Sequence, residues 1–292
     1  MTPRLSVSIP TYQAGRFLRR TLSALCAQSE PSLEILVCDD HSSDATLDIA
    51  RSQDDARVRV IENGERLGLA ANWNRAVAGA TGEFVCLFGQ DDTADAEWAG
   101  TLCDRLAAHP SAGMVFGRRR FVFDDDQSRA TLGEFFEQRY PAMLAPFYAT
   151  LDRLADDLVP AELMLEAAMQ HRFEINLIGE PSFVVFRRTH SAAIGGFDTT
   201  MRQLIDWEFW TRFFAVGPIV TVREVLGSYH LHADGASTEN APLAKHYREL
   251  DYLLGVVLPR FAAHLDAGQT AALIGRRAEA RQLAIEHERR DD

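Results

Sequence analysis

The stretch GEFVCLFGQDDTADAEW, residues 82–98, decides the fold. Its apolar run from Phe84 to Phe88 predicts a strand that is buried on both faces, as in a parallel sheet. Two adjacent carboxylates, Asp91 and Asp92, come directly after this run. Burying carboxylates is costly unless they meet a cation or hydrogen-bond donors, and α/β sheets bind ligands at the carboxyl ends of their strands. The stretch therefore predicts a ligand or metal site at the edge of an α/β sheet.

The first 120 residues alternate between strand and helix patterns. Strand patterns that share β-branched or apolar runs cover residues 4–12, 33–40 and 57–63, before the strand at 84–88. Helical spacing of apolar residues covers 14–28, 43–53 and 68–82, with Ser43 or Asp44 as an N-cap. This βαβαβαβ order predicts a doubly wound, mostly parallel sheet flanked by helices.

The pattern changes after residue 120. Residues 121–175 are rich in helix formers and predict a helical insertion, whereas 176–240 return to strand patterns with one short helix near 206–217. Residues 241–292 predict a helical C-terminal extension. We therefore expect one domain over residues 1–240, followed by that extension. In the short helix we expect Trp207 and Trp210 to face the core, with Gly217 just past the helix end.

Composition narrows the function. The chain has 292 residues and a formal charge of −12, which argues against a nucleic-acid partner but not against a nucleotide held with a metal ion. Its four cysteines have no CxxC spacing, and neither a signal peptide nor a membrane span of about 20 apolar residues is visible. We expect a cytoplasmic protein, for which peripheral contact with a membrane stays open.

Several α/β classes are disfavoured by missing residues. A receiver domain needs a lysine on a late core strand, but the single lysine is Lys245, in the expected helical tail. A dinucleotide-binding fold needs G-x-G-x-x-G after the first strand, where this chain has PTYQAGRF, residues 10–17. The Gly-Lys-Ser/Thr of a P-loop is absent, and so is the Gly-rich, basic start of a sugar-nucleotide pyrophosphorylase.

A second acidic pair, Asp39 and Asp40, ends the strand at 33–40. In a doubly wound sheet these side chains, Thr11 and Tyr12 would share one rim with Asp91 and its neighbour. Four carboxylates there would repel one another unless they divide their partners between a metal and hydrogen-bond donors. The alternative is that such aspartates only cap the following helices.

Four motifs in order resemble the family 2 glycosyltransferases with the GT-A fold. The similarity runs from about Arg4 to Trp98. It comprises I-P-T-Y at residues 9–12, D-D-x-S-x-D at 39–44, N-x-x-x-L-G-x-A-x-N-x-N at 63–74, and the aspartates that follow the next strand. Each motif is weak alone, and their order and spacing make the resemblance specific.

The resemblance implies that residues 1–120 bind a nucleotide-sugar. Pro10, Thr11, Tyr12, Asp39 or Asp40, Arg66, Gln90 and Asp91 would then contact the donor. Asp91 and Asp92 would hold Mn²⁺ or Mg²⁺ against the diphosphate, because hard cations prefer carboxylate and phosphate oxygens. The common form of the last motif is D-x-D-D, and its first aspartate is replaced here by Gly89.

The second half resembles the acceptor side of many bacterial members. Asp206 matches the usual catalytic base, which would deprotonate an acceptor hydroxyl as it attacks the anomeric carbon with inversion. The glutamate that often precedes this base is Ile205 here. Glu208 is the alternative carboxylate, and an N-cap is the alternative role for Asp206. His232 matches a position that can complete the metal shell, and its neighbour His230 would leave the strand on the same face.

The resemblance predicts an inverting, metal-dependent transfer from a UDP-, GDP- or dTDP-sugar to a carbohydrate, lipid-linked or small-molecule acceptor. A degenerate relative that only binds sugars or partner proteins is the alternative, because Gly89 and Ile205 depart from the motifs. Arg118–Arg120 could attract an anionic acceptor or could simply be solvated. The sequence leaves open whether the chain forms a homodimer.

Overall fold

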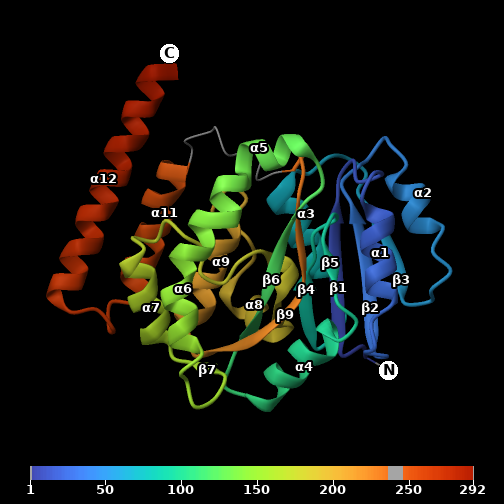
Figure 1. Cartoon of the computed structure of the whole chain (residues 1–292), viewed down its shortest axis with the longest axis horizontal. Coiled ribbons are helices and arrows are strands. Elements are labelled where there is room, and N and C mark those ends of the chain that lie inside the picture. The colour runs from blue at the N-terminus through green and yellow to red at the C-terminus, as the bar shows by residue number, and fades with distance from the viewer. Residues whose placement is uncertain (1, 236–245, 292) are drawn as a thin grey trace.

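The computed structural model describes residues 2–235 and 246–291, and it has the α/β fold that the sequence predicts. A central sheet is covered by helices on both faces (Figure 1). Lys245, which the receiver-domain argument used, lies outside the described residues. The first residues of the expected extension, 241–245, lie outside them as well.

The sheet has the strand order β3-β2-β1-β4-β8-β6-β9-β5. The first four strands, which are β1 (Leu5–Thr11), β2 (Leu33–Asp39), β3 (Val58–Glu62) and β4 (Phe84–Leu87), are mutually parallel, as predicted. β1 is central in this block and is almost wholly buried, because apolar residues alternate with small serines that hydrogen-bond internally. The carboxyl ends of β1, β2 and β4 therefore meet at one edge.

Beyond β4 the strands no longer all run in the same direction. β8 (Val184–Arg187) pairs antiparallel with both β4 and β6 (Met114–Phe123), and the long β9 (Ile219–Leu231) runs parallel to β6. Two short strands, β5 (Thr93–Ala94) and β7 (Leu158–Val159), pair antiparallel with β9. β5 follows Asp91 and Asp92 directly, so its pairing with β9 brings the end of β9 to the aspartates.

Two hydrophobic clusters fill the space between the sheet and the helices. One cluster contains residues of α1 (Leu18–Cys26), α2 (Thr46–Arg51) and α4 (Trp98–Ala108). The other contains residues of α3 (Leu69–Gly79), α9 (Ile205–Phe214) and the helices that follow β6. The chain is therefore three-layered, as a doubly wound sheet requires.

The helical insertion is confirmed. It starts after β6 and comprises α5 (Asp126–Glu134), a π-helical turn (Phe135–Arg139), α6 (Tyr140–Leu151) and α7 (Ala161–Gln170). The extension forms α11 (His246–Arg260) and α12 (Ala267–Asp291), which lie at the side of the molecule away from β3 (Figure 1). Leu253 and Val257 of α11 belong to the same core cluster as the insertion, so the extension packs on the domain.

The structure corrects three details. Pro10 was expected to end the first strand, but β1 continues through it to Thr11, and Pro10 pairs with Cys38. The N-cap of α2 is Ala45, and Asp44 instead accepts a hydrogen bond from the Thr46 amide at 3.0 Å. α9 has its C-cap at Ala215, two residues before the glycine that was expected just past the helix end. The short helix α8 (Arg188–Ile194) had no counterpart in the expected pattern.

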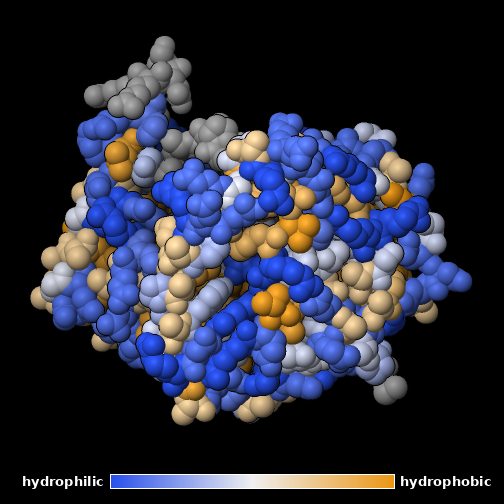
Figure 2. Space-filling view, in the orientation of Figure 1, coloured by the Kyte–Doolittle hydropathy of each residue, from blue (hydrophilic) through white to orange (hydrophobic). Residues whose placement is uncertain are grey.

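The outer surface is mainly hydrophilic on the face that Figure 2 shows, with hydrophobic residues in small separate groups. Among the described helices, none combines the length and the apolar character that crossing a membrane requires.

Candidate functional site

Thr11 and Asp39 lie side by side at the carboxyl edge of the sheet, because they are register partners at the ends of β1 and β2. The Thr11 hydroxyl donates to Asp39 Oδ1 at 2.9 Å, and the amide and hydroxyl of Ser42 donate to the same carboxylate at 2.8 and 2.7 Å. Asp39 Oδ2 accepts only the Ser42 amide in these contacts. That oxygen therefore keeps a lone pair for a further donor.

Asp40 has a different role. Its carboxylate accepts hydrogen bonds from the amides of Leu67 and Gly68 at 2.7 and 2.8 Å and from the Asn63 side chain at 3.1 Å. Gly68 is the N-cap of α3 and has a φ of 87°, which favours glycine. Asp40 thus fixes the loop that leads into α3, and its Oδ2, which accepts only the Gly68 amide in these contacts, keeps a lone pair as Asp39 Oδ2 does.

The loops after β1 and β4 are joined by Gln90 and Tyr12. The Tyr12 amide donates to Gln90 Oε1 at 2.8 Å, and Gln90 Nε2 donates back to the Tyr12 carbonyl at 3.3 Å. The Arg66 guanidinium lies 3.9 Å from the centre of the Tyr12 ring. Three of the predicted donor-binding residues therefore lie together, next to the β1 end that contains Pro10.

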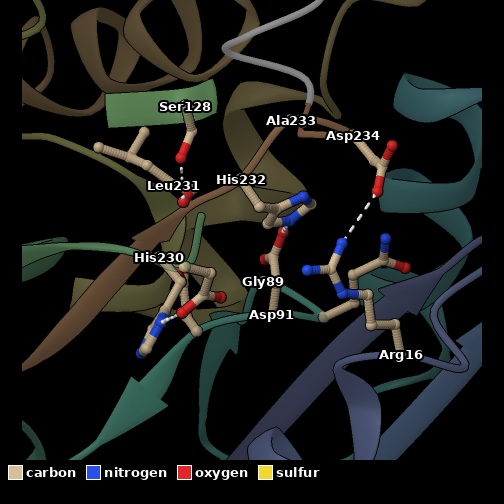
Figure 3. Close-up of polar contacts among 12 residues, drawn as sticks. Arg16, Gly89, Asp91, Ser128, His230, Leu231, His232, Ala233 and Asp234 are labelled. Carbon is tan, nitrogen blue, oxygen red and sulfur yellow. Dashed lines mark hydrogen bonds and ion pairs between the residues drawn. The ribbon is translucent and has the colours of Figure 1, made fainter. Parts of the chain in front are cut away.

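Asp91 faces the end of β9. Its Oδ2 lies 2.8 Å from Nε2 of His232, and the two side chains point toward each other in Figure 3. Phe17 of the segment before α1 stacks on the His232 ring with 4.0 Å between ring centres. The Asp91 side chain is 21% exposed, whereas the histidine is buried. One accessible carboxylate is therefore held by an imidazole in a fixed position.

Asp92 is turned the other way. It is buried, accepts the His230 amide at 2.9 Å on Oδ1, and accepts the Ser182 hydroxyl on Oδ2. Burial and the neighbouring charge of Asp91 raise the pKa of Asp92 well above its usual range. Ser182 also accepts the Gly89 amide at 2.8 Å, so it joins β4 to the chain before β8. This geometry favours a structural role for Asp92.

The two histidines contact different groups. The His230 ring lies 2.9 Å from Asp124 Oδ1 and 3.1 Å from the Thr93 hydroxyl, away from the Asp91 contact (Figure 3). Burial lowers the pKa of His230, which favours the neutral ring. Arg20 donates to Asp124 at 2.8 Å and also to the Asp91 carbonyl at 2.8 Å. These contacts position the loop that presents Asp91.

A divalent metal fits this edge of the sheet. Asp91 and His232 supply oxygen and nitrogen donors, but no group of three or more His, Cys, Asp or Glu side chains among the described residues could hold a metal ion. Magnesium is commonly bound by one or two carboxylates together with substrate phosphates and water. A metal at this edge would therefore depend on a phosphate-bearing ligand.

Asp206 lies in the first turn of α9, whose N-cap is Leu204, so the N-cap alternative is wrong. Asp206 Oδ2 accepts a hydrogen bond from the side-chain amide of Asn176 at 2.9 Å, and Asp206 Oδ1 accepts one from the backbone amide of Trp207 at 2.7 Å. The residue is half-buried. Burial and then the charge of Glu180 raise the pKa of Asp206 to about 7. A carboxylate of this kind suits proton abstraction at neutral pH.

Glu208, the alternative carboxylate, is committed to another partner. It is buried and forms an ion pair with Arg212 at 2.8 Å, and that arginine also donates to the Ile194 carbonyl at 3.0 Å. Trp207 and Trp210 are fully buried, which confirms that they belong to the core. Their indole nitrogens donate to carbonyls of residues 173 and 179. All of these side chains are buried and hydrogen-bonded within the protein, which favours a structural role for them.

The three arginines of β6 do not act together. Arg118 and Arg120 form ion pairs with Asp152 and Asp95. Arg119 points into the protein, where its side chain is 1% exposed and pairs with Glu180 at 2.5 Å. The alternation follows from strand geometry, in which successive side chains leave on opposite faces.

Sequence reasoning missed several residues that hold the site, namely Phe17, Arg20, Asn176, Glu180 and Ser182. Only Asn176 had a usable signal, because it is a lone amide in an apolar context, and the structure leaves it half-buried. Phe17 has the pattern of an ordinary core residue, Arg20, Glu180 and Ser182 are ordinary surface types in the sequence, and the roles of all four depend on contacts between distant segments.

Comparison with known proteins identifies the family. The family model for Glycosyl transferase family 2 matches residues 6–172, so the chain belongs to that family. An uncharacterized protein of Mycobacterium tuberculosis is 34% identical over 210 residues, which are 72% of this chain and 61% of the relative. A Campylobacter jejuni protein named GalNAc(5)-diNAcBac-PP-undecaprenol beta-1,3-glucosyltransferase is 30% identical over 47% of this chain and 44% of its own. The chain thus spans less than two thirds of each relative.

Solved structures confirm the GT-A fold. S. aureus TarS, residues 1–349, in complex with UDP-GlcNAc aligns with a TM-score of 0.64 at 15% identity, covering 94% of this chain and 79% of TarS. A mannosyltransferase of Pyrobaculum calidifontis in complex with GDP-Man and Mn²⁺ aligns with a TM-score of 0.59 at 22% identity, covering 98% and 76%.

Proposed function

We propose that this protein is an inverting glycosyltransferase that moves a sugar from a nucleoside diphosphate to an acceptor hydroxyl. The observation that supports this most directly is the contact between Asp91 and His232, beside the ends of β1 and β2. Family membership and the nucleotide-sugar complexes of structurally similar proteins point the same way.

The donor would lie along the sheet edge. Tyr12 and Arg66 offer a stacked surface for the nucleoside, next to Pro10 and Thr11, and Gln90 fixes the loop beneath it. Asp39 or Asp40 would contact the base, because Oδ2 of each carboxylate accepts a single backbone amide and can take a further donor. The first half of the chain would thus select the nucleotide.

Asp91 and His232 would hold Mn²⁺ or Mg²⁺ together with diphosphate oxygens. When bound, the ion offsets the charge of the departing nucleoside diphosphate. We leave Asp92 out of the ligand set, because it is buried, whereas Asp91 is accessible, and because its oxygens accept the Ser182 hydroxyl and the His230 amide. Asp92 instead keeps the turn after β4 in the shape that presents Asp91.

Asp206 would be the general base. Its carboxylate takes the proton of the acceptor hydroxyl while the acceptor oxygen bonds to the anomeric carbon from the side opposite the diphosphate. The bond between the anomeric carbon and the diphosphate oxygen breaks, and its electrons leave with the nucleoside diphosphate. Attack from the opposite side inverts the anomeric configuration.

The acceptor class is the broadest part of the proposal. Two relatives are named for transfer to diphospho-undecaprenol-linked glycans, which favours a lipid-linked glycan in polysaccharide biosynthesis. Such an acceptor would place the protein at the cytoplasmic surface of a membrane. All four cysteines are free, and three are buried, which agrees with a reducing compartment.

The direct test is a thermal-shift titration with UDP, GDP and dTDP, each with and without Mn²⁺. We expect one nucleotide to stabilise the protein only with metal, and Asp91→Asn to abolish that effect. Asp95→Asn is the matched control, because Asp95 pairs with Arg120 on the surface. Absence of any metal-dependent nucleotide binding would contradict the proposal and favour a degenerate sugar-binding protein. Turnover of the matching nucleotide-sugar separates these two functions.

A further inference from the structure

The side-chain amide of Asn176 contacts both the Asp206 carboxylate and the backbone of the turn that follows Asn176. Asn176 Oδ1 accepts the backbone amides of Ile178 and Gly179 at 3.1 and 2.9 Å. Its Nδ2 donates to the Gly179 carbonyl at 3.0 Å and to Asp206 Oδ2 at 2.9 Å. Asn176 therefore closes a turn on itself and directs its remaining N–H to the carboxylate.

Arg119 packs against this turn and is connected to it through Tyr140. The guanidinium donates to the Tyr140 hydroxyl at 3.0 Å, and that hydroxyl donates to the Asn176 carbonyl at 2.8 Å. Gly179 has a φ of 102°, and its missing side chain leaves the space that the Arg119 guanidinium fills. The turn, the arginine and Asp206 thus form one packed unit that joins β6, α6 and α9.

Glu180 follows the turn directly. Arg119 binds its carboxylate at 2.5 Å, so the position of this second negative charge is fixed by a buried partner. Removing Asn176 or Glu180 would not remove a ligand of the metal site or a nucleotide contact, because neither lies among those residues. Both act on the part of the site that contains Asp206.

We propose that Asn176 and Glu180 are positioning residues for the general base: the side-chain amide of Asn176 aims the Asp206 carboxylate, and Glu180, which Arg119 fixes directly after the same turn, contributes a negative charge that acts on it. This inference rests on the proposed function, in which Asp206 abstracts the proton of the acceptor. Carboxylates that share a site favour the protonated form of one member, and a hydrogen bond to the charged form does the opposite. The hydrogen bond from Asn176 therefore lowers the pKa of Asp206, whereas the charge of Glu180 raises it, and Asp206 can titrate near neutral pH.

The other charges near Asp206 are largely neutralised. On its own helix, Glu208 is paired with Arg212. From α11, Glu249 accepts the backbone amides of residues 202–204. From β6, Arg119 pairs with Glu180 and donates to the hydroxyls of Tyr140 and Tyr148 of α6. Of the neighbouring charges, that of Glu180 raises the pKa of Asp206 most, so its removal should change the proton affinity of Asp206 most.

The test is the pH dependence of kcat/KM for sugar transfer. In the plot of rate against pH, the acidic limb is the range in which the rate falls as Asp206 becomes protonated. Glu180→Gln removes the neighbouring negative charge and should move that limb to lower pH by about one unit. Asn176→Asp removes the donor and adds a charge, and should move the limb to higher pH. Glu162→Gln, an exposed carboxylate of α7, is the control and should leave the profile unchanged.

Opposite shifts would support the proposal, and a purely structural role would lower the rate at every pH without moving the limb. If Asn176→Asp does not fold, Glu180→Gln alone decides, because Glu180 is partly exposed and glutamine keeps an oxygen that can accept a hydrogen bond from Arg119. An unmoved limb in Glu180→Gln, with normal nucleotide binding and an inactive Asp206→Asn, overturns the inference while the proposed function stands. An active Asp206→Asn would instead overturn the assignment of the base.

Discussion

Asp91 and His232 are separated by 141 positions in the chain, yet Oδ2 of the aspartate lies 2.8 Å from Nε2 of the histidine. The contact exists because β5, directly after the aspartates, pairs with β9, whose end presents the histidine. One side of the site thus depends on the second half of the chain, and the first half alone would supply only one of the two donors.

The first prediction concerns that pair. His232→Ala should weaken Mn²⁺ binding in the presence of the preferred nucleotide by about tenfold or more, because one of the two protein donors is lost. Isothermal titration with Mn²⁺ measures this. His230→Gln is the matched control, since its ring contacts Asp124 and Thr93 while its backbone amide still binds Asp92. Equal losses in both variants would argue against His232 as a ligand.

The second prediction concerns Gly89. A Cβ at this position would lie 2.6 Å from Asp92 Oδ2 and 3.0 Å from Asp91 Oδ1. Because Ser182 holds Asp92 in place, we expect Gly89→Ala to lower the free energy of unfolding by about 1–3 kcal/mol and to weaken nucleotide binding. Gly89→Asp, which restores the commoner motif, should do the same.

Chemical denaturation with thermal-shift binding checks both variants. Gly100→Ala is the control, because a Cβ there meets nothing within 4 Å and the residue lies inside α4. Alanine should stabilise that helix by about 0.5–1 kcal/mol. If Gly89→Asp is stable and binds metal more tightly, Asp91 and Asp92 around Gly89 can rearrange, and the prediction is wrong.

The order of strands and helices could be predicted from the sequence because β1, β2 and β4 are short, mainly apolar segments that polar residues follow within a few positions. The direction of β8 could not, because a four-residue apolar strand has the same pattern in either orientation. The opposite orientations of Asp91 and Asp92 could not be predicted either. They depend on Ser182, which lies 90 positions from Asp92, and on the backbone of β9.

The third prediction concerns the general base. Asp206→Asn should lower kcat by about 10²–10⁴-fold, the usual contribution of a positioned base. Because the pKa of Asp206 is raised to about 7, the wild-type rate should fall as pH drops through that value and reach a plateau above it. Initial rates of nucleoside diphosphate release between pH 5 and 9 measure this. Glu208→Gln cannot serve as a control for folding, because its ion pair is buried.

The fourth prediction concerns the buried arginine of β6. Arg119→Met leaves Glu180 without its partner in the interior, and removing one member of a buried pair costs about 3–5 kcal/mol of unfolding free energy. Arg120→Met, on the opposite face of the same strand, removes a half-exposed arginine that pairs with Asp95, and exposed pairs contribute about 0–1 kcal/mol.

Urea denaturation of the two variants measures the difference directly. A large loss for Arg119→Met with a small one for Arg120→Met would fit an interior ion pair that supports the turn behind Asp206. Double replacement of Arg119 and Glu180 by Met and Leu extends the test, because apolar residues of similar volume often restore the stability of a buried pair. If the double variant recovers stability but not transfer, the pair serves the site and not the fold.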